Sequence, residues 1–390
     1  MFAVRLRQIA CFIILSTAAH FVAAQDASPL PGPVRLVLPP ALYAVEGHET
    51  NVYFDNVTLT INPRNYAFDV HCPKGNHLEE RWTFTPAAED VGKHLFALDV
   101  RNERNEIIAR DDCELIVVPA NAQAEKELTL LLIGDSLTHA SVYSRHLLDL
   151  SLQPGQPELT LIGSHNPLGE NDKDNRHEGY GGWTALRFAT HFTETARTGD
   201  YAQRGSPFLY VDENGEKKLD FKRYVQDVNE GNYPDIATIF LGPNDIFRYT
   251  DDDVAEGIEL MLTHYDVLIE MLQSKRSLTK VAVMLPVPPA ASQDAFGANY
   301  RTGQTRWQYK RNTHLLVEKM LERYAGREEE GIFIVPTYVN LDCEHNYPAG
   351  EAKWNAQADG KGTRLNNSVH PAASGYRQIG DTLYAWLLAQ

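Results

Sequence analysis

One stretch of apolar residues, which stops abruptly at a turn, does most to restrict the fold of this chain. Residues 128–133 read Leu-Thr-Leu-Leu-Leu-Ile, and Gly134-Asp135-Ser136 follows them directly. A short apolar run that ends in a turn signal is typical of a strand buried on both faces, and residues 139–152 have the pattern of a helix. We therefore predict that Ser136 lies where a buried strand turns into a helix. In open α/β sheets the chemistry lies at this edge, where the first amides of a helix favour an anion.

Four more strand-like runs follow along the chain, with helical stretches between them. The clearest helix is expected at residues 251–274, where apolar residues recur at helical spacing after an acidic first turn. Strands that alternate with helices indicate a parallel sheet covered on both faces. We therefore predict a three-layer α/β/α sandwich at residues 128–390, with a five-stranded parallel sheet. The later strands are expected at residues 159–163, 235–241, 280–285 and 332–336, and further helices at residues 305–324 and 373–388.

The residues before this domain follow a different pattern. Short alternating runs, punctuated by Gly, Pro, Asn and Asp, fill residues 34–120 and predict a β-sandwich domain. We expect it to be either a carbohydrate-binding module or a spacer, joined to the next domain by a polar linker at residues 121–127. Cys72 and Cys113 both lie in this domain, so we predict that they form a disulfide and that Cys343 stays free. The expected strands are residues 34–38, 51–54, 57–61, 66–70, 80–85, 94–100 and 113–118.

The first residues of the chain have the pattern of a targeting signal. Two early arginines, an apolar stretch at residues 9–19 and small residues before position 25 give residues 1–24 the form of a signal peptide. We therefore expect a secreted or periplasmic protein with no integral membrane segment once the peptide is removed, and residues 25–33 as a linker. The formal net charge of −16 argues against nucleic-acid binding and against adhesion to anionic membranes.

Three further motifs follow predicted strands and should meet Ser136 at the same sheet edge. The glycines of residues 179–182 allow backbone amides to approach a ligand closely. Asn244, in Gly-Pro-Asn-Asp, can donate its side-chain amide to a developing oxyanion. His370, in His-Pro before the last helix, can take the proton from Ser136. Taken singly, the glycines could form a flexible loop, Asn244 a turn, and His370 a surface histidine. Chance would scatter such motifs, whereas these all map to one sheet edge in a fixed order along the chain.

In this order the motifs resemble those of the SGNH (GDSL-type) hydrolase superfamily, over about residues 128–390. The resemblance implies a flavodoxin-like fold and a serine esterase that needs no metal or cofactor. It also implies Ser136 as nucleophile, His370 as base, and an oxyanion hole formed by Ser136, Gly182 and Asn244. Gly182 is preferred to its neighbour Gly181 because it directly precedes the expected helix start. The scattered histidines show no zinc-ligand spacing.

One position departs from the family pattern. The superfamily has Asp-x-x-His-Pro, whereas the residue three before His370 is Asn367. Its carbonyl oxygen could orient the ring but lacks the charge that stabilises an imidazolium. Three explanations stay open: a Ser–His dyad, a carboxylate supplied from elsewhere such as Asp342 or Asp359, or reduced activity. We predict that Asn367 orients the imidazole ring of His370.

These features together predict a secreted esterase that works through an acyl-serine intermediate. Export, an accessory β-domain and a polar chain resemble the polysaccharide-processing members, so the expected substrate is an O-acetylated polysaccharide or oligosaccharide. One alternative is a lipase or acyl-lipid esterase, although residues 166–182 and 195–232 are polar and an acyl groove needs apolar lining. Another is a non-catalytic carbohydrate-binding protein on a decayed hydrolase fold, which Asn367 alone supports.

Overall fold

The computed structural model describes residues 34–198, 203–274 and 278–390. Residues 33–390 form one compact unit. The expected signal peptide and most of the linker after it lie outside the described residues. Within the described ranges, no helix is both long enough and apolar enough to span a membrane.

A parallel sheet forms the centre of the α/β part (residues 127–390), and it contains all five predicted strands. Their spatial order is β11-β10-β15-β16-β17, which is the doubly wound order 2-1-3-4-5 of flavodoxin-like folds. A two-residue strand, β12 (Glu178–Gly179), pairs with the end of β10. Ligands of such sheets bind where the strand order reverses, which here is the carboxyl end of β10 and β15. The bounds are β10 (Glu127–Gly134), β11 (Glu158–Ile162), β15 (Ile236–Phe240), β16 (Lys280–Met284) and β17 (Ile332–Val335).

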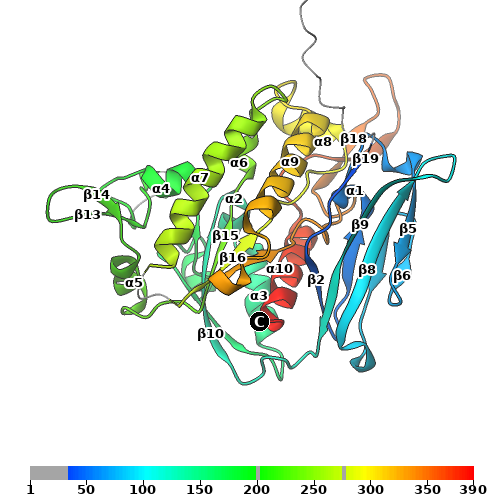
Figure 1. Ribbon diagram of the computed structural model, residues 1–390. Helices are drawn as coiled ribbons and strands as arrows, with labels where there is room; N and C mark the ends of the chain where they lie inside the picture. The colour runs from blue at the N-terminus through cyan, green and yellow to red at the C-terminus, as the bar shows by residue number, and fades with distance from the viewer. Residues whose placement is uncertain (1–33, 199–202, 275–277) are drawn as a thin grey trace, which may run out of the picture. The chain divides into compact units, whose positions relative to one another are not determined.

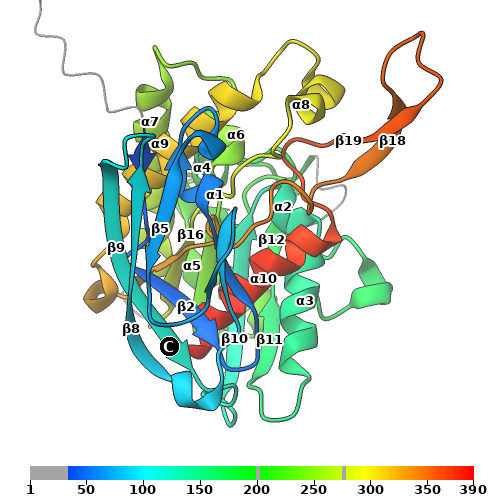
Figure 2. The ribbon, with the colours of Figure 1, turned by 90° about the vertical axis from the view of Figure 1, so that its right-hand side faces the viewer.

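Helices cover both faces of this sheet, as predicted. On one face lie α7 (Val254–Leu272) and α9 (Arg306–Tyr324), and on the other lie α3 (Val142–Ser151) and α10 (Ala373–Leu388) (Figures 1 and 2). Leu131 of β10 belongs to the core on the α7 side, whereas its neighbour Leu130 belongs to the core on the α10 side. Both faces of the strand are therefore buried, which is why its sequence shows no polar alternation.

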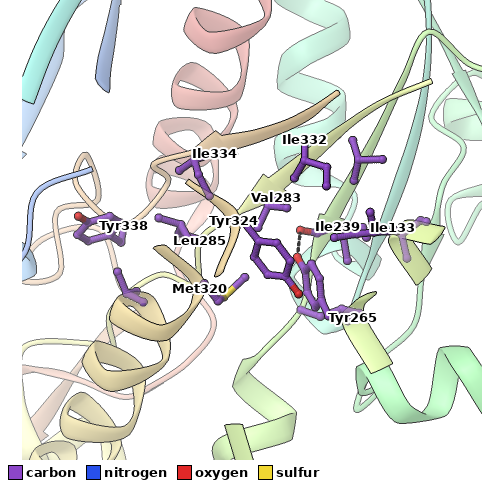
Figure 3. Close-up of a cluster of buried hydrophobic side chains, with 14 of the residues drawn as sticks. Ile133, Ile239, Tyr265, Val283, Leu285, Met320, Tyr324, Ile332, Ile334 and Tyr338 are labelled. Atoms are coloured by element: carbon purple, nitrogen blue, oxygen red, sulfur yellow. Dashed lines mark hydrogen bonds between the residues drawn. The ribbon is translucent and has the colours of Figure 1, made fainter. Parts of the chain in front are cut away.

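The core on the α7 side joins the sheet to its helices through aromatic residues. Ile239, Val283 and Ile332 come from three strands and pack with Tyr265 and Tyr324 (Figure 3). The Tyr265 hydroxyl donates a hydrogen bond of 2.6 Å to the carbonyl of Ile239, so its polar group is satisfied inside the core.

The helix expected at residues 139–152 is observed as α3, which begins only at Val142. A separate short helix, α2 (Ser136–His139), precedes it. Between the two helices, Ser141 adopts a left-handed conformation with φ of 60°. The Ser141 hydroxyl lies 2.8 Å from Nε2 of His177. The two residues are 36 positions apart, so the sequence around Ser141 could not predict this contact. The remaining elements are α4 (Ala185–Thr190), β13 (Leu209–Val211), β14 (Lys217–Leu219), α5 (Phe221–Asn229), α6 (Pro243–Ile246), α8 (Gln293–Tyr300), β18 (Ala349–Lys353) and β19 (Lys361–Leu365).

The β-rich part (residues 34–118) confirms that the N-terminal region is built from strands. A four-stranded sheet, β2-β9-β8-β5, and a three-stranded sheet, β3-β7-β6, meet where Trp82 contacts Phe96 edge to face at 5.1 Å. The sequence did not predict β2, which pairs in parallel with β9. The bounds are β1 (Arg35–Leu36), β2 (Ala41–Val45), β3 (Thr50–Tyr53), α1 (Phe54–Val57), β4 (Thr58–Leu59), β5 (Ala67–His71), β6 (Asn76–His77), β7 (Arg81–Phe84), β8 (Gly92–Arg101) and β9 (Ile107–Val118).

The β-rich part is attached to the α/β part by buried polar contacts as well as by apolar packing. The side chain of Asn56 donates to the carbonyls of Tyr338 and Leu341 at 2.9 and 2.7 Å. Nearby, the buried Lys310 on α9 forms an ion pair with Asp55. Apolar residues of the two parts belong to one continuous core.

The predicted disulfide is wrong, because Cys72 and Cys113 are both free thiols. Cys113 on β9 pairs with Phe96 on β8. Cys72 directly follows His71 of β5, which pairs with Ala97, so Cys72 lies on the other side of Phe96. Two strand spacings put the cysteines roughly 10 Å apart, whereas a disulfide needs Cα atoms within about 7 Å. Cys343 is free and buried, as expected.

Candidate active site

Ser136 occupies the strand-to-helix turn that the sequence predicts. Gly134 ends β10, Asp135 caps α2 by accepting from the amide of Leu137 at 2.9 Å, and Ser136 is the first residue of that helix. Position 134 requires glycine, because a Cβ atom there would overlap the side chain of Thr138. The turn therefore leaves Ser136 partly exposed at the end of a buried strand.

His370 is brought to Ser136 by the loop between β19 and α10. Its Nε2 atom lies 2.8 Å from the Ser136 hydroxyl oxygen, although 234 positions separate the two residues. Burial lowers the pKa of His370 below the ordinary value of 6.5, which favours the neutral imidazole that a general base requires. Helix α10 begins at Ala373, so His370 and Pro371 lie in the loop directly before it.

Asn367 directs its side-chain oxygen to the backbone. That oxygen accepts from the amides of Val369 at 3.2 Å and His370 at 3.0 Å, which fixes the turn that carries the histidine. The structure shows no hydrogen bond from Asn367 to the imidazole. A role for Asn367 in orienting the ring stays a prediction, and the contacts seen are those of a side chain that holds the backbone.

The two carboxylates considered as substitutes are placed elsewhere. Asp342 accepts from Nδ1 of His345 at 3.1 Å and from the Tyr53 hydroxyl at 3.3 Å. Asp359 is exposed in the loop between β18 and β19. In the described ranges no carboxylate forms an ion pair with His370, so the geometry is that of a Ser–His pair.

The glycine stretch forms a tight turn with two available amides. The amide of Trp183 donates to the carbonyl of Tyr180 at 3.1 Å, and Gly182 has φ of 76°, which suits glycine. A Cβ atom added to Gly182 would meet nothing within 4 Å, so this position faces open space. Among the described residues, the amides of Gly181 and Gly182 have no hydrogen-bond acceptor. Either can therefore donate to a bound anion.

Glu178, which the sequence analysis did not identify, lies in β12 directly before this turn. Its buried carboxylate accepts from the hydroxyls of Tyr180 and Tyr224, and from the amide of Ser164 at 2.6 Å. Burial raises the pKa of Glu178, and these donors oppose the rise. The signal in the sequence was an acidic residue directly before the glycines, but one of its two tyrosine partners, Tyr224, lies 46 positions away.

Asn244 lies between Ser136 and the glycine turn. Its amide nitrogen donates to the carboxylate of Asp135 at 3.0 Å and to the carbonyl of Trp183 at 3.2 Å. The next residue, Asp245, accepts from the amide of Ala185 at the start of α4 at 3.0 Å. The Gly-Pro-Asn-Asp stretch thus ties together the two turns that flank the candidate site.

Asp135 and Asp245 were not predicted as functional residues. Burial raises the pKa of each to about 7. The bond from Asn244 to Asp135 joins the ends of β10 and β15, so it depends on strand order rather than on local sequence. Among the described residues, no three His, Cys, Asp or Glu side chains are grouped to hold a metal ion.

One comparison with known proteins identifies a family. The family model described as GDSL-like lipase/acylhydrolase matches residues 130–383, a range that includes Ser136, Gly182, Asn244 and His370. No curated protein matches the chain.

Several solved structures are similar at low identity. One is Est24, a carbohydrate acetylesterase from Sinorhizobium meliloti, at 14% identity and a TM-score of 0.36, with 67% of this chain and 99% of that chain covered. The acetyl xylan esterase AlAXEase is 14% identical with a TM-score of 0.33, and 67% and 100% of the two chains are covered. The inhibitor-bound aryl esterase of M. smegmatis is 13% identical with a TM-score of 0.36, and 67% and 99% are covered. The match to the family model spans more than half of this chain, so the chain belongs to the GDSL-like lipase/acylhydrolase family.

Proposed function

We propose that this protein is a serine esterase that removes O-acetyl groups from a polysaccharide or oligosaccharide through an acyl-serine intermediate. The observation that carries the proposal is the 2.8 Å contact between the Ser136 hydroxyl and Nε2 of His370 at the carboxyl end of the central strand. A serine hydroxyl is a weak nucleophile until a base takes its proton, and this contact supplies the base.

The proposed reaction begins with attack of the Ser136 oxygen on the ester carbonyl while His370 takes the proton. The resulting tetrahedral oxyanion would be stabilised by the amides of Ser136 and Gly182 and by the side chain of Asn244. His370 then gives its proton to the departing sugar hydroxyl. A water molecule, activated by the same histidine, hydrolyses the acyl-serine and restores the enzyme.

Asn244 can donate to the oxyanion only if one of its two amide protons leaves its present acceptor or is shared with it. Both of its amide protons are engaged, one by Asp135 at 3.0 Å and one by the carbonyl of Trp183 at 3.2 Å. An oxyanion is a stronger acceptor than a neutral carbonyl. We therefore infer that the longer bond, to Trp183, gives way during the reaction.

A carbohydrate ester is favoured over an acyl lipid because the segment before the glycine turn is polar. Asn166, Asp172 and Asn175 in this segment form a network of side-chain hydrogen bonds, which is a poor lining for an acyl chain. Secretion or a periplasmic location is proposed from residues 1–24 alone. The lipase remains the second enzyme candidate.

The test is release of acetate from acetylated xylan, measured beside hydrolysis of long-chain 4-nitrophenyl esters. We expect acetate release by the parent enzyme and a loss of more than about a thousandfold in Ser136→Ala. Ser151→Ala is the matched control, because this serine lies at the end of α3 and bonds only the carbonyl of Leu148. A preference for long acyl chains would favour the lipase. Xylan binding without hydrolysis of any ester would favour the decayed hydrolase.

A further inference from the structure

A cleft of about 770 Å³ lies between the β-rich part and the α/β part. One wall comes from the segment between β3 and β5, and the other from residues near the start of α8 and from β19. Neither Ser136 nor His370 lines it. Its volume falls in the range of clefts that bind organic ligands.

The first wall contains an aromatic side chain, Tyr66, that is available to stack on a ligand. Tyr66 is half-buried, and among the described residues its hydroxyl forms no hydrogen bond and its ring meets no other ring or cation. Phe68 beside it stacks on Phe54 with centroids 4.7 Å apart, and Ile61 is 74% exposed. Apolar side chains grouped with an amphipathic ring suit the C–H faces of a sugar.

The charges of the cleft restrict the class of ligand. Its three arginines are engaged in ion pairs: Arg64 with Glu80, Arg306 with Asp55 at 2.9 Å, and Arg364 with Asp294 at 2.9 Å. The cleft is also lined by Glu79, Asp342 and Glu344. Carboxylates therefore outnumber arginines six to three in the lining. Carboxylate oxygens accept from hydroxyl groups but repel anions, so the cleft suits a neutral polyol and disfavours uronate or phosphate ligands.

The second wall leads directly to the candidate active site. Thr363, Arg364 and Leu365 of β19 line the cleft, and the chain runs from Leu365 to His370 in five residues. Five residues span at most about 17 Å. The same wall includes Ala291, and the amide of its neighbour Ala290 donates to the carbonyl of Ser368 at 3.0 Å.

We propose that this cleft binds a neutral segment of the polysaccharide whose acetylated sugar reacts at Ser136. The proposal rests on the proposed function, since it assigns the cleft to the same polymer. It makes the β-rich part a contributor to substrate binding rather than a spacer, with Tyr66 as the stacking residue.

The first experiment measures binding apart from catalysis, in the Ser136→Ala background. The probes are deacetylated xylan, glucomannan and hydroxyethylcellulose as neutral polymers, and polygalacturonate as an anionic one, each by affinity gel electrophoresis. We expect at least one neutral polymer to bind, Tyr66→Ala to weaken that binding roughly three- to tenfold, and Tyr66→Phe to retain it. Leu152→Ala, which alters an exposed apolar residue beyond the end of α3, should bind like the parent.

The second experiment compares polymer and small ester with Ser136 intact. Tyr66→Ala should raise KM for the acetylated form of the bound polymer, so that the ratio of kcat/KM for polymer to kcat/KM for 4-nitrophenyl acetate falls roughly three- to tenfold. Binding of no neutral polymer, binding that is equal in Tyr66→Ala and Leu152→Ala, or preferred binding of polygalacturonate would overturn the cleft assignment. Tyr66-dependent binding by a parent that hydrolyses no ester would instead reject the proposed function.

Discussion

The histidine of the candidate site differs from that of a Ser-His-Asp triad because, among the described residues, it has no carboxylate partner. His370 contacts Ser136, and no carboxylate of the described residues pairs with its ring. Asn367 stands where the family pattern has aspartate and bonds the backbone of the turn. The candidate site therefore contains a serine–histidine pair, in which burial and the conformation of the loop set the state of the proposed base.

The pH dependence of hydrolysis should follow from this burial. Burial lowers the pKa of His370, and the reaction needs the neutral ring, so the rate should fall only as the pH drops below 6.5. Asn367→Asp would add a negative charge near the imidazolium, raise the pKa and move the acidic limb to higher pH. The measurement is kcat/KM for 4-nitrophenyl acetate between pH 4 and 9. An acidic midpoint above 7 in the parent would contradict this interpretation.

Substitutions at position 367 distinguish the explanations for the missing aspartate. Asn367→Asp can accept the same two amides, so its rate should hold or rise. Asn367→Ala loses both bonds and should lower kcat/KM by about tenfold, since the turn that carries His370 is no longer fixed. Asp359→Asn, in an exposed loop, is the control and should leave the rate unchanged. If Asn367→Ala is silent and Asp342→Asn is damaging, the carboxylate comes from Asp342 instead.

At the scale of elements, two glycines of the stretch at residues 179–182 are needed for different reasons. At Gly179 an added Cβ atom would lie 2.7 Å from the backbone nitrogen of His139, whereas at Gly182 it would meet nothing within 4 Å. The first glycine allows β12 to approach α2 closely. The second supplies a positive φ and an available amide.

These differences predict opposite effects of alanine at the two positions. Gly179→Ala should cost more than about 3 kcal/mol of stability, because backbone must move. Gly182→Ala should cost about 1–2 kcal/mol through its φ yet lower the rate on any ester. Urea denaturation and ester hydrolysis, measured on both variants, check this. A Gly179→Ala variant as stable as the parent would show that α2 and β12 are not held in this contact.

The five strands of the central sheet could be predicted because each is a short apolar run, and β10, β15 and β16 are buried along most of their length. Elements whose form depends on remote contacts could not. The break between α2 and α3 rests on Ser141 and His177, and the support of the glycine turn rests on Glu178 and Tyr224. Ser136 and His370 could be paired from motif order, since the carboxyl ends of parallel strands share one edge.

At the scale of the whole molecule, the two parts share a core and a cleft. The disulfide was predicted from proximity in sequence, but the order β5-β8-β9 separates Cys72 from Cys113 by a full strand. Strand order is a property of the assembled sheet, so spacing along the chain could not reveal it. Stability of the β-rich part then comes from packing against its neighbour rather than from a covalent bridge.

This arrangement predicts that reductant leaves stability unchanged. A disulfide that closes a loop of this size would contribute about 2–4 kcal/mol, and its reduction would lower the melting temperature. Calorimetry with and without dithiothreitol should give the same single transition, because one core joins both parts. Thiol titration of the unfolded protein under non-reducing conditions should detect Cys72, Cys113 and Cys343. A melting temperature that falls on reduction would contradict the free thiols.

The most direct test of the account is labelling with a fluorophosphonate, which reacts with activated serines. We expect a covalent adduct on Ser136, identified by peptide mass spectrometry, together with loss of ester hydrolysis. Labelling should disappear in Ser136→Ala, fall strongly in His370→Ala, and persist in Ser151→Ala. Labelling that survives Ser136→Ala, or a parent that hydrolyses esters while Ser136 stays unlabelled, would contradict the claim that this serine and His370 perform the reaction.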